Sequence, residues 1–204
     1  MSTIQNIEDL EPWLLDYVPE SGRTALDVGA NMGAFSRFLA KRFEQVIAFE
    51  PQPNITVELP TNVVLNNVAV GDEVGELELH LYRANVHASG GSVGDAVAND
   101  DRGLPVGSIT VPITTLDAWA PFEVTDGAAH IDFIKIDVEG MEVAVIRGAL
   151  DLLMDHKPIL LIECHAIEHR DTLEKSLELM EYDLVRIPHP SPSVGPGHSW
   201  LYAH

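Results

Sequence analysis

Acidic residues follow several apolar runs of this chain, and they are the side chains best placed to do chemistry. Asp27, Glu50, Asp137 and Glu163 each stand at or just beyond the end of such a run, and His165 comes two positions after the last of them. If the runs are parallel strands, their carboxyl ends meet at one edge of a sheet, where open sheets bind ligands. The alternative is helix capping, because a carboxylate stabilises the exposed N–H groups of a following helix.

A glycine-bearing turn follows the first apolar run. Residues 27–33 read D-V-G-A-N-M-G, in which Gly29 allows a sharp turn and Gly33 allows a helix to pack closely on the sheet. This spacing differs from the G-x-G-x-x-G pattern that brings backbone N–H groups against a pyrophosphate. The acid at Asp27 would repel a phosphate and favour an ammonium or sulfonium group.

The second apolar run ends at Glu50 and Pro51. An acid in this position hydrogen-bonds the two hydroxyls of a ribose, because two carboxylate oxygens match a vicinal diol. Pro51 prevents a helix from beginning at once and holds the carboxylate outward. A glycine turn with a ribose acid and no obligatory phosphate contact indicates a nucleoside-containing cofactor. S-adenosylmethionine fits, since its sulfonium is positive and an amino acid replaces the pyrophosphate.

The elements that must position these residues alternate along the chain. Apolar runs predict strands over residues 24–28, 45–49, 63–65 with 68–70, 133–136, 159–162 and 184–187, and helical spacing predicts helices over 34–42, 141–153 and 172–182. This alternation predicts a doubly wound α/β fold whose mostly parallel sheet has helices on both faces. Residues 77–82 and 109–113 alternate in polarity and are expected to pair as a small β insertion between the third and fourth strands.

Length and composition favour one domain over residues 1–204, with 46% hydrophobic residues to fill its core. We expect a helix within residues 1–22 and two long loops, 83–108 and 188–198, over the side where a substrate binds. The only cysteine, Cys164, rules out an internal disulfide and a cysteine-based metal site. We expect it to be a small buried residue and not a nucleophile.

The charge is strongly negative: 12 basic and 32 acidic residues give a net charge of −20. This charge opposes nonspecific binding to nucleic acid or to an anionic membrane surface. No apolar run reaches the roughly 18 residues of a membrane span, and residues 1–16 lack the features of a signal peptide. We therefore expect a cytoplasmic protein that acts on a small molecule, while the oligomeric state stays open.

Several motifs, in this order, resemble the FkbM-type family of class I methyltransferases. They are D-V-G-A-N-M-G from Asp27, F-E-P around Glu50, N-V-A-V-G from Asn67, T-L-D from 115, I-K-I-D-V-E-G-M-E over 134–142 and I-E-C-H over 162–165. The similarity covers residues 25–165, and its most specific part is K-I-D-V-E-G. It implies an S-adenosylmethionine-dependent, Rossmann-like fold with seven strands, in which residues 200–203 form an antiparallel last strand beside 184–187.

The resemblance also implies roles for individual residues. The methionine part of S-adenosylmethionine would be held by the turn residues Asp27, Gly29, Ala30, Asn31 and Gly33. The ribose would be held by Glu50 with Pro51, and the adenine would lie near Asn67, Val68 and Ala69. Asp137 would lie beside the methionine amine or the sulfonium.

The activity implied is O-methyl transfer to a hydroxyl of a sugar, polyketide or other metabolite, which requires a proton acceptor. His165 is the first candidate for this base and Asp137 the second. Alternatively, Asp137, Glu139, Glu163 and His165 could hold Mg²⁺, which suits oxygen-rich ligands, although Glu139 could instead cap the helix that follows. Nitrogen acceptors, a non-catalytic S-adenosylmethionine-binding module and a nicotinamide-dependent dehydrogenase remain alternatives.

Overall fold

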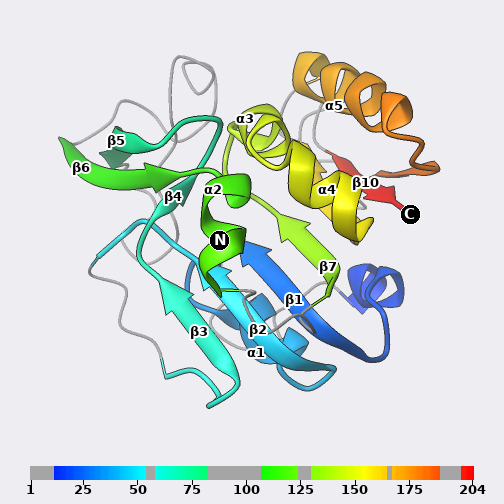
Figure 1. Cartoon of the computed structure of the whole chain (residues 1–204), viewed down its shortest axis with the longest axis horizontal. Coiled ribbons are helices and arrows are strands. Elements are labelled where there is room, and N and C mark those ends of the chain that lie inside the picture. The colour runs from blue at the N-terminus through cyan, green and yellow to red at the C-terminus, as the bar shows by residue number, and fades with distance from the viewer. Residues whose placement is uncertain (1–11, 54–57, 82–106, 124–129, 165–166, 189–198) are drawn as a thin grey trace.

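A seven-stranded sheet runs through the protein in the computed structural model (Figure 1). The structure describes residues 12–53, 58–81, 107–123, 130–164, 167–188 and 199–204. The strand order is β3-β2-β1-β7-β8-β10-β9, and β10 runs antiparallel to both neighbours, whereas the other pairs of adjacent strands are parallel. The strands are β1 (Gly22–Val28), β2 (Phe43–Phe49), β3 (Val63–Asn66), β7 (Ile131–Ile136), β8 (Ile159–Cys164), β9 (Leu184–Pro188) and β10 (Ser199–Ala203).

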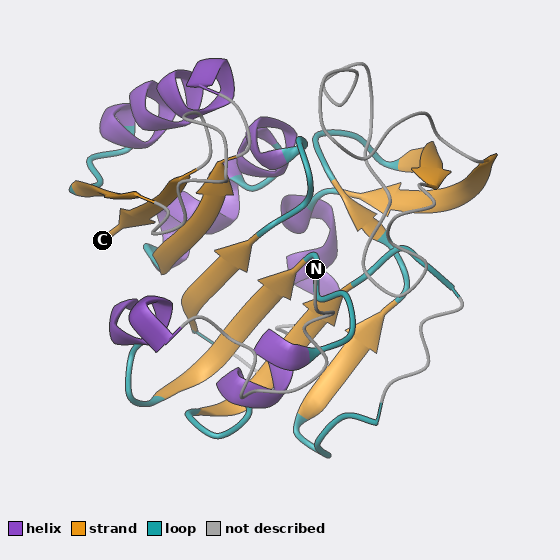
Figure 2. Ribbon diagram, turned by 180° about the vertical axis from the view of Figure 1, so that it is seen from behind, coloured by secondary structure: helices purple, strands orange, loops and turns teal. Residues whose placement is uncertain are grey.

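Helices cover both faces of this sheet (Figure 2). One face is covered by a 3-10 helix (Pro12–Tyr17) and by α1 (Ala34–Leu39). The other face is covered by α2 (Leu116–Glu123), α3 (Glu142–Arg147), α4 (Leu150–His156) and α5 (Ile167–Leu179). Alternation along β7 separates the two cores, since Phe133 packs with α1 whereas Ile134 and Ile136 pack with α3 and α4. The predicted doubly wound α/β fold with an antiparallel last strand is confirmed.

A second, three-stranded sheet lies between β3 and β7 in the sequence, as the predicted β insertion requires. It is ordered β4-β6-β5, with β4 (Ala69–Val70), β5 (Gly75–Leu81) and β6 (Gly107–Thr114), and β5 pairs antiparallel with β6. The expectation that residues 68–70 belong with the third strand is wrong. Ala69 and Val70 pair with β6 instead. The chain leaves the main sheet after Asn66, and the Asn67 side chain donates a hydrogen bond to the Glu50 carbonyl (3.2 Å).

The prediction of one continuous helix over residues 141–153 is wrong. The segment forms two helices, α3 and α4, which are separated at Gly148. A Cβ atom at Gly148 would lie 2.0 Å from the carbonyl oxygen of Gly71, so this glycine lets the two backbones touch. Asp117 then caps the second helix: its carboxylate accepts hydrogen bonds from the N–H groups of Asp151 (3.2 Å) and Leu152 (2.9 Å). The T-L-D motif therefore has a structural role.

Other boundaries differ from the predictions by a few residues. The helix expected over 172–182 spans Ile167–Leu179, α1 ends at Leu39, and α2 was not predicted. The two long loops fall largely in residues 82–106 and 189–198, outside the described residues, as do residues 1–11 of the expected first helix. Within the described part of the chain, no helix is long and apolar enough to cross a bilayer.

Candidate active site

A pocket opens at the carboxyl ends of β1, β2 and β7 and is bordered by β4 and β5 of the small sheet. It encloses about 600 Å³, counting open solvent at its mouth. The pocket lies where the strand order reverses, between β1 and β7, which is the position expected for a ligand in an open α/β sheet.

Most of the residues singled out from the sequence line this pocket. They are Gly29, Asn31, Glu50, Pro51, Val68, Ala69, Asp137 and Glu139. Four of the predicted cofactor-binding residues are not among the lining residues: Asp27, Ala30, Gly33 and Asn67. Sequence reasoning missed an apolar wall, which the small sheet and the segment before α3 supply through Val70, Leu77, Leu79 and Met141.

Glu50 is 3% exposed, although it lines the pocket. Its Oε2 accepts a hydrogen bond from the backbone N–H of Asn31 (2.8 Å), and its Oε1 accepts one from Gln52 (3.0 Å). Burial raises the pKa of Glu50 above its ordinary value, and the two backbone N–H groups partly oppose this. Because each carboxylate oxygen accepts at two positions, the side chain is oriented by the backbone and still has acceptor capacity.

The glycine turn is held against the neighbouring strands by its backbone. The N–H groups of Gly29 and Ala30 both donate to the Phe49 carbonyl, at 3.0 and 2.9 Å. Gly29 has φ of 81°, and a Cβ atom there would lie 1.8 Å from the carbonyl oxygen of Asp137. Only glycine permits this approach, so the turn brings β2 and the segment after β7 to the same side of the pocket.

Asp27 points to the α1 side of the sheet, where it is fully buried. Its Oδ2 accepts a hydrogen bond from the Ser36 hydroxyl (2.5 Å), and its Oδ1 lies 3.2 Å from Nζ of Lys135. The ammonium group that Asp27 meets in the structure is therefore that of a lysine in the adjacent strand. In the sequence this lysine belongs to the K-I-D-V-E-G motif, but no contact with Asp27 could be predicted from it.

Lys135 joins three parts of the site. Its Nζ donates to the Gly29 carbonyl (2.7 Å) and lies 3.3 Å from Oδ2 of Asp137. Burial acts to lower the pKa of Lys135, but the nearby carboxylates of Asp27 and Asp137 outweigh burial and raise it. The lysine therefore stays charged while its side chain is only 5% exposed.

The segment between β7 and α3 follows the pocket wall. Asp137 donates its backbone N–H to the Val28 carbonyl (3.0 Å), and Glu139 has φ of 56° in the left-handed region. Helix α3 begins at Glu142 with Met141 as its N-cap, so Glu139 stands outside the capping position. Glu142 is fully buried and accepts the N–H of Gly140 (3.0 Å), which anchors this segment.

The predicted metal ligands are not gathered in the part of the chain that the structure describes. Asp137 and Glu139 line the pocket, but Glu163 is not among its lining residues. Among the described residues, no three His, Cys, Asp or Glu side chains form a group that could hold a metal ion. His165, the predicted base and fourth ligand, lies outside the described residues, so its catalytic role stays a prediction.

Cys164, the last residue of β8, is fully buried. Burial raises the pKa of its thiol to about 12, so the thiolate needed for nucleophilic chemistry is not available near neutral pH. The prediction of a buried cysteine is confirmed.

The strand order, the antiparallel β10 and the pocket at the reversal point together define a class I methyltransferase fold. A family model described as "Methyltransferase FkbM domain" matches residues 27–184. The chain belongs to this family.

Two known proteins illustrate the relationship. The chain is 25% identical over 152 residues to methyltransferase sdnD of Sordaria araneosa, an alignment that covers 60% of this chain and 59% of that protein. The crystal structure of methyltransferase FkbM from Methylobacillus flagellatus KT superposes with a TM-score of 0.54 at 17% identity, covering 91% of this chain and 44% of that one. This second similarity bears on the fold. The chain thus spans about three-fifths or less of each relative's length.

Proposed function

We propose that the protein binds S-adenosylmethionine in this pocket and transfers its methyl group to a hydroxyl of a small molecule. The observation that carries the proposal is the arrangement of Glu50 and Asp137, which approach one pocket from the ends of β2 and β7, the two strands that flank β1. Glu50 would bind the ribose hydroxyls, and Asp137 would lie near the methionine amine or the sulfonium. Gly29 and Asn31 would border the methionine part, with Pro51, Val68 and Ala69 beside the nucleoside.

The charges around the pocket fit a cationic ligand. Glu50, Asp137 and Glu139 line the pocket, and Lys135 pairs with Asp137 and with Asp27 behind the wall. The formal sum of these groups is four negative charges less one positive, or −3. In a largely buried site, this excess favours a sulfonium or ammonium and disfavours a phosphate. Because Asp27 already pairs with Lys135, it would act on the ligand only indirectly, through that lysine.

The bound cofactor supplies an electrophilic methyl group, and the chain must align an acceptor with it and remove a proton. Asp137 and Glu139 line the pocket, and the buried ion pair with Lys135 suits Asp137 to a fixed negative charge. His165, which directly follows β8, is the proposed base. The apolar wall formed by Val70, Leu77 and Leu79 could pack against adenine or against an organic acceptor.

Titration calorimetry with S-adenosylmethionine and with NAD tests the cofactor. We expect binding of the first and none of the second, and the reverse result would favour a dehydrogenase. Release of S-adenosylhomocysteine from a panel of sugars, phenols, polyketide alcohols and amines tests the reaction. Binding without turnover on the whole panel would favour a non-catalytic module. His165→Ala should bind the cofactor normally and transfer methyl slowly; turnover at the parent rate across pH would place the base elsewhere.

A further inference from the structure

Lys135 lies behind the pocket and reaches the groups at its wall. Its side chain is 5% exposed, and it is not among the lining residues. Two of its partners, Gly29 and Asp137, do line the pocket. Its third partner, Asp27, is fully buried on the α1 side of the sheet. The lysine therefore connects a carboxylate that a ligand cannot reach with a carboxylate that a ligand can reach.

The position of this lysine follows from strand register. Strands β1 and β7 are parallel neighbours, and Asp27 pairs directly with Lys135. Both side chains lie on the face that α1 covers, where the ring of Phe35 is 5.9 Å from Nζ and Ser36 binds Asp27. The aromatic ring and the helix keep water from this side, so the ion pair is strong and the ammonium group is held in one place.

We propose that Lys135 is a positioning residue for the amino-acid end of the cofactor, because its ammonium is anchored by Asp27 and fixes the Asp137 carboxylate and the Gly29 carbonyl at the pocket wall. The inference rests on the proposed function. It separates the roles of the two aspartates: Asp27 holds the lysine, and Asp137 meets the ligand. No direct contact between Lys135 and the ligand is required.

The geometry supports an effect confined to one end of the ligand. The three acceptors of Lys135 lie 2.7 to 3.3 Å from Nζ and belong to the ends of β1 and β7. Glu50 is oriented separately, by the backbone N–H groups of Asn31 and Gln52. Loss of the lysine should therefore disturb the methionine side of the pocket and leave the ribose side in place.

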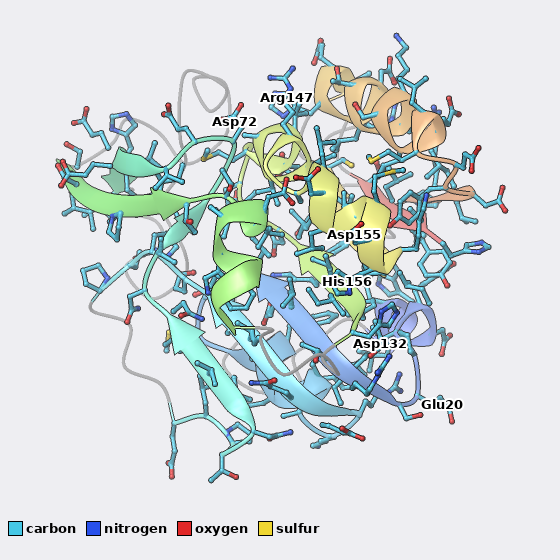
Figure 3. The ribbon with its side chains drawn as sticks, in the orientation of Figure 1. Glu20, Asp72, Asp132, Arg147, Asp155 and His156 are labelled. Atoms are coloured by element: carbon cyan, nitrogen blue, oxygen red, sulfur yellow. The ribbon has the colours of Figure 1, made fainter. Side chains whose placement is uncertain are left out.

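The test uses Asp27→Asn combined with Lys135→Met. Lys135→Met alone would leave the buried Asp27 carboxylate without a compensating positive charge and destabilise the protein, whereas the double variant removes both charges. Its local charge is unchanged, since Asp27, Lys135 and Asp137 sum to −1 and Asp137 alone is also −1. The control is Lys157→Met, because Lys157 also donates its ammonium group to a backbone carbonyl, that of Met180, but it is exposed. Its neighbour His156 lies beside the start of β7, at the other end of the strands (Figure 3).

Three ligands are compared by calorimetry: S-adenosylmethionine, S-adenosylhomocysteine and 5′-methylthioadenosine, which lacks the amino acid. In the double variant we expect the first two to bind about 10- to 100-fold more weakly, the loss typical of hydrogen bonds to charged groups. Binding of 5′-methylthioadenosine should change by less than about twofold. The control should bind all three as the wild type does.

Two other results with the double variant would overturn the inference about Lys135. An equal loss for all three ligands would make Lys135 merely structural, and unchanged or tighter binding of S-adenosylmethionine would remove its positioning role. If the double variant does not fold, Asp137→Asn must produce the same ligand pattern by itself, and an equal loss with that variant also overturns the inference. A wild-type protein that binds none of the three ligands refutes the proposed function, which a loss confined to the variants does not.

Discussion

Replacement of Glu50 by alanine is the sharpest test of the ribose site. The carboxylate accepts one backbone N–H on each oxygen, at 2.8 and 3.0 Å, and each oxygen can accept a second hydrogen bond. Two ribose hydroxyls would add two hydrogen bonds to a charged group, each contributing about 1.5–3 kcal/mol. Water hydrates the hydroxyls in the variant and offsets part of this loss. We therefore expect S-adenosylmethionine to bind more weakly by about 1–3 kcal/mol, or roughly 5- to 150-fold.

The assay for Glu50→Ala is calorimetry with S-adenosylhomocysteine and its 2′-deoxy analogue, because the pair isolates one hydroxyl. Wild-type protein should prefer the ribose form, and Glu50→Ala should bind the two forms almost equally. Thermal denaturation of both proteins shows that the comparison is made on folded chains. A variant that keeps the wild-type preference, or binds with unchanged affinity, would refute the assignment of Glu50 to the ribose.

The same site should respond to pH. Burial raises the pKa of Glu50 above the ordinary value of 4.5, and a protonated carboxyl group accepts fewer hydrogen bonds. Binding should therefore weaken on acidification at a higher pH than an exposed glutamate would produce. Glu50→Gln, which carries no titratable group, should lack this change; an identical pH profile for both proteins would contradict the prediction.

Three predictions concern stability. Asp117→Ala should lower the free energy of unfolding by about 1–2 kcal/mol, because it removes the cap of α4; a urea titration measures this, and no change would exclude the cap. Glu181→Gly should stabilise the chain by about 0.5–1 kcal/mol in the same assay, since Glu181 has φ of 61° just after α5, and a loss would contradict this account. Burial, with a smaller effect of His130, lowers the pKa of His156 from 6.5, so the unfolded state binds more protons below about pH 6.5 and stability falls on acidification. His156→Asn should flatten the dependence of Tm on pH in this range. An unaltered slope would show that other groups cause the pH dependence.

Local sequence patterns identify two kinds of pocket residue: a glycine that the backbone turn requires, and an acid that follows an apolar strand. A glycine is needed where Gly29 meets Asp137, and Glu50 follows a strongly apolar strand. Both could be predicted because turn geometry and strand alternation depend on neighbours in sequence. The break between α3 and α4 could not, because Gly148 is required there by contact with Gly71, which is remote in sequence.

The amino-acid sequence by itself determined the alternating α/β architecture, the glycine turn and the acid that follows the second strand, since periodicity and local chain stereochemistry are encoded within short segments. Tertiary structure alone decided that Asp27 faces Lys135 and not the pocket. Pairing of β1 with β7 sets this contact, and the cover of α1 buries it. Register and burial arise from segments far apart in the chain, so the partner of a charged residue is settled only when those segments pack together.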